Sequence, residues 1–143
     1  MRARLFVSVI LICVVTASTR LLADDAHDAA KQEARQAAES WLALVDSERY
    51  DDSWSAASSL FRKAVSQEQW QSAVRAARDP FGKVKTRALM SATYSTSLPG
   101  APDGEYVVIR YETAFEHKQS AIETVTPMLD TDGHWRVSGY YVK

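Results

Sequence analysis

The side chains with the clearest chemical potential in this sequence are hydroxyls on predicted strands. With the strand register argued below, six of them share the helix-facing side of one sheet: Tyr94, Tyr111, Thr113, Thr124, Thr126 and Tyr141. Hydroxyls gathered between apolar walls hydrogen-bond small neutral ligands, so this face is the candidate binding cleft. Threonine and tyrosine are also good strand and core residues, so an ordinary core is the competing interpretation.

No residues stand out as catalytic. General acid–base catalysis needs a titratable group in the cleft, and only Asp130 lies at its predicted rim. There is no G-x-S-x-G elbow and no glycine-rich phosphate loop, so we expect no cofactor. His27 is predicted to lie in the leading helix or in the N-terminal tail, and His117 and His134 in turns. His134 beside Asp130 and Asp132 makes a weak metal set at best, so no metal site is predicted.

Composition limits the function classes. The 143 residues are enough for one domain, and 46% hydrophobic against 24% charged residues is typical of a folded globular protein. A net charge of −1 argues against a nucleic-acid binder. The single cysteine excludes a disulfide within the chain.

The N-terminus has the layout of a secretory signal peptide. The basic start Met1–Arg4 is followed by the apolar run Leu5–Val15 and then by small residues. We predict a signal peptide over residues 1–23, cleaved after Ala23 or alternatively after Ala17, and a secreted or periplasmic protein. The apolar run is too short to span a bilayer, so no stable membrane anchor is expected after cleavage; an uncleaved anchor is the alternative.

Two further features concern this segment. Cys13 lies inside the apolar run and follows Ile12, whereas a lipid-acceptor cysteine follows a small residue, so we interpret it as an ordinary signal-peptide residue. Cleavage after Ala23 removes three arginines and leaves 14 basic against 18 acidic residues. An acidic mature chain argues against nucleic acid and anionic lipid as partners.

The remaining residues, 24–143, are predicted to form a single α+β domain, because helical patterns come first and strand patterns follow. Apolar stripes at three- and four-residue steps predict three helices, over residues 25–46, 51–63 and 67–78. Ser66 and Gln69 fit a capping box at the start of the third. Alternation predicts four strands in an antiparallel, curved meander, with the three helices packed on one face.

Two turns set the expected register. A polar turn over residues 116–121 places Phe115 opposite Ile122, and hence Tyr111 opposite Thr126. A two-residue Asp132-Gly133 hairpin places Thr131 opposite His134, and hence Thr124 opposite Tyr141. Both registers put the same residues on the helix-facing side: Val107, Ile109, Tyr111, Thr113, Phe115, Ile122, Thr124, Thr126, Met128, Trp135, Val137, Gly139 and Tyr141. The first strand adds Ala88, Met90, Ala92 and Tyr94.

The outer sheet face is predicted to be mixed. It carries a candidate partner or homodimer surface at Tyr106, Val108, Val125 and Tyr140; a solvated face is the alternative interpretation. Trp41, Trp54 and Trp70 lie at helical core spacing, and Trp135 is expected to pack against them.

Several segments resemble one bacterial protein family. They are Ala92–Tyr106, Glu123–Met128, Trp135–Tyr141, Ala38–Trp41, Trp54 and Ser66–Trp70. The resemblance is to the domain of unknown function 4019, and it implies a bacterial exported setting without an assigned activity. The order of helices before a curved sheet is similar to cystatin-like and nuclear transport factor 2-like cones.

The sequence therefore predicts an exported, non-catalytic module that binds a small ligand or a protein through a helix–sheet cleft. The alternative is a small cone-fold enzyme of the isomerase or hydrolase class. That alternative requires a carboxylate in the cleft, from Asp130, Glu112 or Glu123, and a shifted register would supply one.

Overall fold

The computed structural model describes residues 15–143, with the backbone alone over residues 15–23. The basic start, most of the predicted apolar run and Cys13 lie outside the described residues, so the signal peptide stays a prediction. Among the helices that the structure describes, none is long and apolar enough to cross a membrane. Helices come first and strands follow, which confirms the predicted α+β class.

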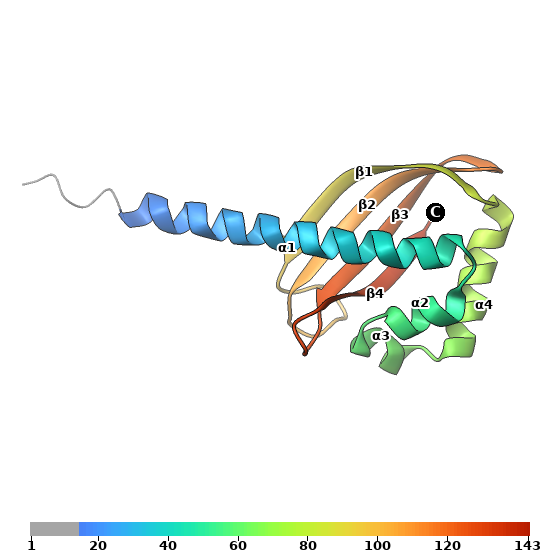
Figure 1. Cartoon of the computed structure of the whole chain (residues 1–143), viewed down its shortest axis with the longest axis horizontal. Helices are drawn as coiled ribbons and strands as arrows, with labels where there is room; N and C mark the ends of the chain where they lie inside the picture. Colours follow the sequence, from blue (N-terminus) through green and yellow to red (C-terminus); the bar gives the residue numbers. More distant parts are fainter. Residues whose placement is uncertain (1–14) are drawn as a thin grey trace, which may run out of the picture.

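Four α-helices precede the sheet in the described chain: α1 (Val15–Asp46), α2 (Tyr50–Ala56), α3 (Ser59–Ala64) and α4 (Gln67–Arg78). The N-terminal part of α1 projects beyond the sheet (Figure 1). Ala34 is the first buried side chain in the described part of this helix, and Ala38, Leu42 and Val45 continue the buried stripe. Their three- and four-residue spacing places them on one face, so only the C-terminal half of α1 belongs to the core.

The second predicted helix, over residues 51–63, is wrong, because the structure has two shorter helices there, α2 and α3. The backbone is extended at Ala57 and Ser58, with ψ values of 165° and 159°. Ser58 donates its backbone N–H to the carbonyl of Val137 in strand β4 (Trp135–Val142) at 2.8 Å. Its hydroxyl accepts the backbone N–H of Phe61 and caps α3. This contact with the sheet edge overrides the helical pattern and gives α2 and α3.

The third predicted helix is confirmed as α4, with the predicted bounds and the capping box between Ser66 and Gln69. A 3₁₀ turn, η1 (Asp79–Phe81), follows it. Gly82 then turns the chain into the sheet at φ +75°, where a Cβ would lie 2.8 Å from Oε2 of Glu116. Only glycine satisfies both the backbone angle and the close approach.

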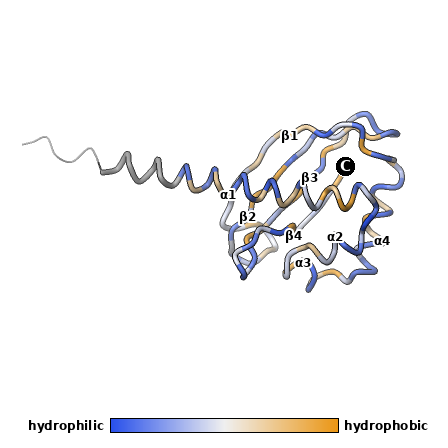
Figure 2. The backbone as a smooth tube through the Cα atoms, in the orientation of Figure 1, coloured by the Kyte–Doolittle hydropathy of each residue, from blue (hydrophilic) through white to orange (hydrophobic). Residues whose placement is uncertain are grey.

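The strands form one antiparallel sheet in the order β1-β2-β3-β4, as the predicted meander requires. Their bounds are β1 (Val84–Ser95), β2 (Tyr106–Phe115), β3 (Lys118–Leu129) and β4 (Trp135–Val142). The sheet curves around α1, and α2, α3 and α4 gather at the C-terminal end of that helix (Figure 1). Hydrophobic positions concentrate along the strands and this end of α1, whereas the turns are mostly hydrophilic (Figure 2).

The predicted register between β2 and β3 is wrong by three residues. Tyr111 lies opposite Glu123 rather than Thr126, because residues 118–120 belong to strand β3 instead of extending the turn. Three is an odd shift, so the paired β3 side chains from Ala121 to Met128 lie on the face opposite to the predicted one. The β3 side chains that are buried under the helices are Ala121, Glu123, Val125 and Pro127.

The β3–β4 turn is one residue longer than predicted. The backbone N–H of Asp130 donates to the carbonyl of His134, where Thr131 had been expected to face His134. Gly133 closes the turn at φ +81°, the left-handed position that a three-residue hairpin loop requires.

A bulge in β4 then compensates for the longer turn. Pro127 lies opposite Val137, and the extra residue at position 138 restores the predicted register, so that Thr124 faces Tyr141 as predicted. The same bulge directs Tyr140 toward the helices. Tyr141, which was predicted to face the helices, is 60% exposed on the outer face.

Strand β1 carries a bulge at Met90, between residues paired with β2 on either side. The prediction is confirmed for two helix-facing residues of this strand and wrong for Ala88 and Met90. The β1 residues paired with inward-facing β2 residues are Arg87, Leu89, Ala92 and Tyr94. The bulge therefore turns both Leu89 and Ala92, three residues apart, toward α1.

The predicted tryptophan core is confirmed. Trp41 and Trp70 are buried with ring centroids 5.5 Å apart, and Tyr140 packs 5.5 Å from Trp41. Both indole nitrogens donate to Ser53, from Trp41 to its carbonyl at 2.8 Å and from Trp70 to its hydroxyl at 2.9 Å. Trp54 and Trp135 are partly buried against this cluster.

Candidate functional site

The six predicted cleft hydroxyls do not form one site. Tyr94, Tyr111 and Thr113 face the helices, whereas Thr124, Thr126 and Tyr141 lie on the outer face because of the register shift. The three inward hydroxyls also differ in their hydrogen bonds: two of them bind different carboxylates, and that of Tyr111 has no partner in the described chain. The hydroxyl of Tyr94 donates to Glu105 at 2.8 Å, and that of Thr113 donates to Glu123 at 2.6 Å.

The predicted partner surface is also divided. Val125 is fully buried and Tyr140 packs inside the core, so both lie on the opposite side of the sheet from Val108. Tyr106 is buried beneath the β1–β2 connection, where its hydroxyl donates to the carbonyl of Pro102 at 2.7 Å. These residues therefore do not make one contiguous outer patch.

The titratable groups singled out by the sequence are mostly in turns. Glu112 is exposed and accepts a hydrogen bond from Ser120. Asp130 is buried, but at the N-terminus of α3, where it accepts both the backbone N–H and the hydroxyl of Ser59. His134 is exposed. In residues 15–143, no three His, Cys, Asp or Glu side chains are grouped to hold a metal ion.

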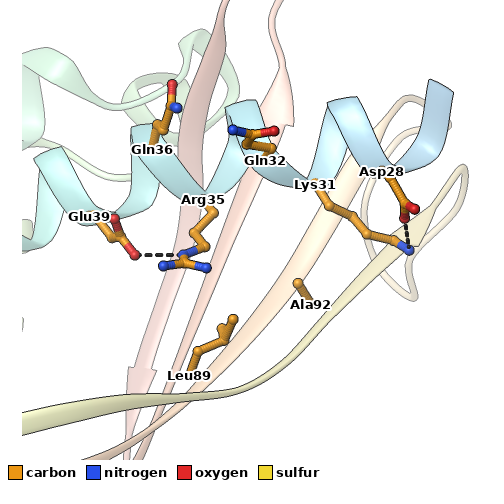
Figure 3. Close-up of a pocket in the computed structure, with 8 residues that line it drawn as sticks. All are labelled: Asp28, Lys31, Gln32, Arg35, Gln36, Glu39, Leu89 and Ala92. Carbon is orange, nitrogen blue, oxygen red and sulfur yellow. Dashed lines mark hydrogen bonds and ion pairs between the residues drawn. The ribbon is translucent and has the colours of Figure 1, made fainter. Parts of the chain in front are cut away.

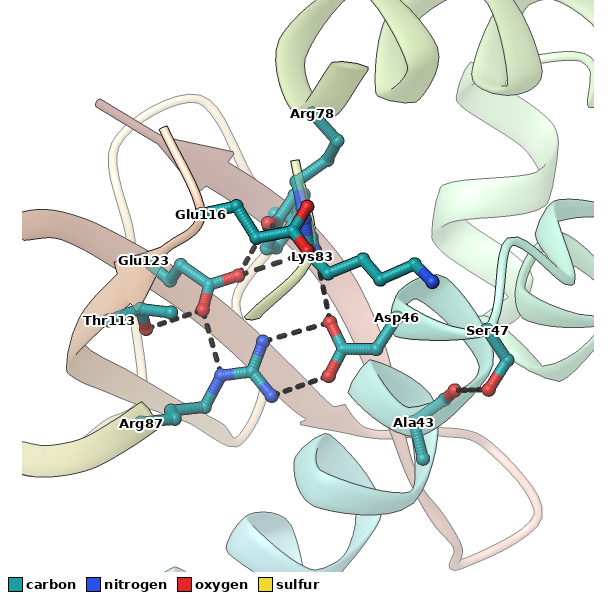
Figure 4. Close-up of polar contacts among 10 residues, drawn as sticks. Ala43, Asp46, Ser47, Arg78, Lys83, Arg87, Thr113, Glu116 and Glu123 are labelled. Atoms are coloured by element: carbon teal, nitrogen blue, oxygen red, sulfur yellow. Dashed lines mark hydrogen bonds and ion pairs between the residues drawn. The ribbon is translucent and has the colours of Figure 1, made fainter. Parts of the chain in front are cut away.

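Glu123 is the exception: it lies fully buried under the helices, within a network of charged and polar side chains (Figure 4). Its Oε1 accepts from Nε of Arg87 at 2.8 Å and from the hydroxyl of Thr113 at 2.6 Å. Its Oε2 accepts from the hydroxyl of Tyr140 at 2.6 Å, and Nη1 of Arg78 lies 3.6 Å away. Both oxygens therefore find their partners inside the protein.

Asp46 completes the network from the end of α1. Its two oxygens accept from the terminal nitrogens of Arg87 at 2.7 and 3.0 Å, and Oδ1 also accepts from Arg78 at 2.8 Å. Six elements contribute one side chain each, α1, α4, β1, β2, β3 and β4, and the two arginines balance the two carboxylates. Matched charges, with both carboxylates fully hydrogen-bonded, are the condition under which a buried ionic network is compatible with a stable fold.

The pKa directions agree with this structural role. Burial alone would raise the pKa of Asp46, but the hydrogen bonds from Arg87 and Arg78 outweigh it and hold this pKa below its usual value. The pKa of Arg87 is raised although burial opposes the charge, because Asp46 and Glu123 both accept its hydrogen bonds. Burial and the charge of Glu123 raise the pKa of Tyr140. Asp46 and Arg87 are therefore held in their charged forms, and Tyr140 in its neutral form, at neutral pH.

A groove lies away from the network, between α1 and β1 (Figure 3). Its volume is 460 Å³, and its lining combines charged and amide side chains of α1 with two apolar side chains of β1: Asp28, Lys31, Gln32, Arg35, Gln36, Glu39, Leu89 and Ala92. The α1 charges pair with one another, Lys31 with Asp28 at 3.1 Å and Arg35 with Glu39 at 2.7 Å. The groove is thus amphipathic and close to neutral.

Tyr111 lies beside this groove. It is the β2 partner of Leu89 and points to the same side of the sheet. Its hydroxyl is buried and has no hydrogen-bond partner in the described chain. Burial, together with the nearby charge of Glu39, raises its pKa to about 12, so the hydroxyl stays protonated and available as a donor. Of the six predicted hydroxyls, this one alone is buried and unpartnered among the described residues.

Two contacts tie the walls of the groove together. At one end His27 of α1 stacks on Tyr94 of β1, with ring centroids 4.3 Å apart and an interplanar angle of 21°. Beyond the other end, Arg87 of β1 binds Asp46 of α1. The groove is therefore a bounded stretch of the interface between α1 and the first strand.

A second hollow, of 250 Å³, touches the network where Asp46 and Arg78 reach its surface. Acidic and basic side chains both line it, including Glu48, Lys83 and Glu116. The Nε of Arg78 is buried without a partner in the described chain. Compared with the α1–β1 groove, this hollow is smaller, and a smaller share of its lining surface is apolar.

Sequence reasoning missed the ionic network completely. Arg78 and Arg87 are not singled out by any sequence pattern, and the predicted register places Glu123 on the outer face. One available signal was that Glu123 alternates with Ala121 and Val125, but the alternation of Ile122 with Met128 on the other face was equally strong.

Comparison with known proteins bears on the family. The model of the family described as "Protein of unknown function (DUF4019)" matches residues 37–140, a range that includes all six residues of the ionic network. No curated protein and no solved structure matches the chain. The likeness to cystatin-like and nuclear transport factor 2-like cones therefore stays a prediction. Since the match covers most of the chain, this protein belongs to the DUF4019 family of proteins of unknown function.

Proposed function

We propose that this protein is an exported, non-catalytic binding module whose ligand lies in the α1–β1 groove. The observation that carries the proposal is the buried, unpartnered hydroxyl of Tyr111 beside that groove. A buried hydroxyl without a partner costs about 1–3 kcal/mol. An acceptor group on a bound ligand would remove that cost, which gives the groove a reason to be occupied.

The walls of the groove favour this role because they are able to rearrange. Leu89 is 42% exposed although it faces α1, so apolar surface is available to a ligand. The ion pair between Arg35 and Glu39 is solvent-exposed, and such pairs contribute little to stability. A ligand that displaces this pair toward solvent therefore gives up little stability to reach Tyr111.

Export is supported by the N-terminal sequence and is compatible with the fold. Cleavage after Ala23 would remove only the projecting start of α1, because the buried stripe of this helix begins at Ala34. The mature chain would keep every helix-to-sheet contact described above. Intact-mass analysis of the protein recovered from the periplasm is expected to give a chain that begins at Asp24; a full-length chain there would contradict cleavage.

A second candidate is an enzyme that uses Glu123. An enzyme of the isomerase or hydrolase class requires a carboxylate that faces the helices, and Glu123 does so. Its environment argues against the role, because both oxygens accept hydrogen bonds from neighbouring side chains and the side chain is fully buried. A general base needs a free lone pair within reach of substrate, and neighbouring side chains already occupy both oxygens of Glu123.

Native mass spectrometry of the full chain, exported by a bacterial host and purified without unfolding, tests the proposal. We expect a reproducible extra mass on the wild type that is absent from Ala92→Trp, in which the new side chain fills the groove. Ala88→Trp is the matched control, because Ala88 lies on the outer side of the same strand and should keep the extra mass. A bare wild type, or equal loss from both variants, would contradict the proposal. A released molecule whose mass changes on incubation with the protein would favour the enzyme.

A further inference from the structure

The outer edge of β1 is unpaired. In the four-stranded sheet β1 pairs only with β2, and no backbone hydrogen bond within residues 15–143 reaches its other side between Val84 and Ser95. The opposite edge of the sheet is partly closed, since Ser58 donates its backbone N–H to Val137 of β4. An open edge presents a row of N–H and C=O groups, and the chemical group that satisfies such a row is another extended backbone.

The groove runs beside this open edge. Its α1 wall extends from Asp28 to Glu39, which at the rise of an α-helix is about 16 Å. A segment of about five residues in extended conformation has that length. A strand added to β1 would direct alternate side chains to the side of the sheet that faces α1. There they would lie beside Leu89 and Ala92 of β1, which offer apolar contact (Figure 3).

Charge favours one kind of segment and one direction. The α1 charges at the groove are already paired within the helix, whereas Lys83 and Lys85 at the start of β1 are exposed and form no ion pair in the described chain. The sheet is antiparallel, so a strand that extends it has its C-terminal end beside the start of β1. Acidic residues or a free carboxylate at that end would meet the two lysines.

The bulge at Met90 favours a short segment over a second copy of this chain. It interrupts the regular ladder in the middle of β1, and a long flat edge is what two sheets need to pair with each other. In an antiparallel pair of two β1 strands, the lysines of one copy would also face the uncharged residues 93–96 of the other rather than acidic groups.

We infer that β1 binds an extended peptide segment of a partner protein by antiparallel strand addition. The segment has apolar side chains at alternate positions, facing Leu89 and Ala92, and acidic groups at its C-terminal end beside Lys83 and Lys85. The inference rests on the proposed function, since it names the ligand class of the α1–β1 groove.

The test uses a defined peptide and the full chain. The probe is a seven-residue peptide with a dye at its N-terminus, alternating valine and threonine, and ending in two glutamates with a free carboxylate. Fluorescence anisotropy is expected to show saturable binding, and hydrogen exchange is expected to slow at the amides of β1. Ala92→Trp should weaken binding at least about tenfold and Ala88→Trp less than about twofold. Lys85→Glu should weaken it about threefold to tenfold, and a peptide ending in lysines should restore it.

Three results would overturn the inference. They are no saturation up to about 1 mM peptide, protection that lies outside β1, and a concentration-dependent doubling of mass that protects β1 without peptide. The mass experiment separates this failure from that of the proposed function. A retained, Ala92-dependent molecule that is not a peptide would leave the groove as a binding site and reject strand addition; no retained molecule and no peptide binding would reject both.

Discussion

Arg87 donates from Nε to Oε1 of Glu123 at 2.8 Å, while its terminal nitrogens bind both oxygens of Asp46. One guanidinium thereby joins strand β1 to strand β3 and to the end of α1. Arg87 precedes the groove residue Leu89 by two positions, so the network fixes the spacing of the two groove walls near one end. The ionic network therefore fixes β1, β3 and α1 relative to one another, and the groove lies between two of these elements, α1 and β1.

Glu123→Gln is expected to destabilise the fold by about 3–5 kcal/mol, because it leaves two buried arginines with one carboxylate between them. Urea unfolding followed by circular dichroism measures the change. Glu112→Gln is the control: Glu112 is exposed on β2 and its loss should change the free energy of unfolding by less than about 0.5 kcal/mol. Equal effects of the two substitutions would contradict the structural role of the network.

Asp46 predicts a particular dependence of stability on pH. Its pKa is held below the unfolded value of 3.8, so its stabilising contribution is fully present above that value and is lost as pH falls through the lowered pKa. The difference in unfolding free energy between wild type and Asp46→Asn should therefore be constant near neutral pH and shrink below pH 3.8. Urea titrations between neutral and acidic pH measure it. A difference that grows on acidification has the wrong sign for this account.

Two tyrosine-to-phenylalanine substitutions should separate an unpartnered hydroxyl from a partnered one. Tyr111→Phe removes a buried hydroxyl without a partner, so the ligand-free protein should be more stable by about 1–3 kcal/mol. Tyr140→Phe removes a hydroxyl that donates to Glu123 and accepts from Arg78, and should cost about 1.5–3 kcal/mol. Thermal unfolding of ligand-stripped protein compares them. A large loss for Tyr111→Phe would mean that its hydroxyl has a structural partner, and the argument for the groove would fail.

The structure also indicates which parts of a fold a sequence predicts well. The capping box at Ser66 fixes the start of α4 through contacts three residues apart, so the sequence alone was sufficient. The break between α2 and α3 depends on Ser58 reaching Val137, nearly eighty residues later, and no local pattern contains that information.

The candidate site shows the same limit more sharply. The outer face predicted for Glu123 followed from the expected β2–β3 turn, whereas the structure buries this carboxylate between arginines from α4 and β1. Because of this single register error, Thr124 and Thr126 were predicted on the inner face, where the structure has Glu123 and Val125. The helix-facing position of Tyr111 was predicted correctly, because the alternation of β2 around this residue does not depend on the turn.

Hydrogen exchange on the exported protein, before and after its ligand is removed by unfolding and refolding, tests the central claim that the α1–β1 groove is the binding site. In the protein as purified, the account predicts slower exchange at β1 and at α1 residues 28–39. This protection is lost when the ligand is removed and regained when the material released on unfolding is added back. Ala92→Trp should show no such difference. Identical exchange in both states, or a difference confined to the outer sheet face around Val108 and Tyr141, would contradict the claim.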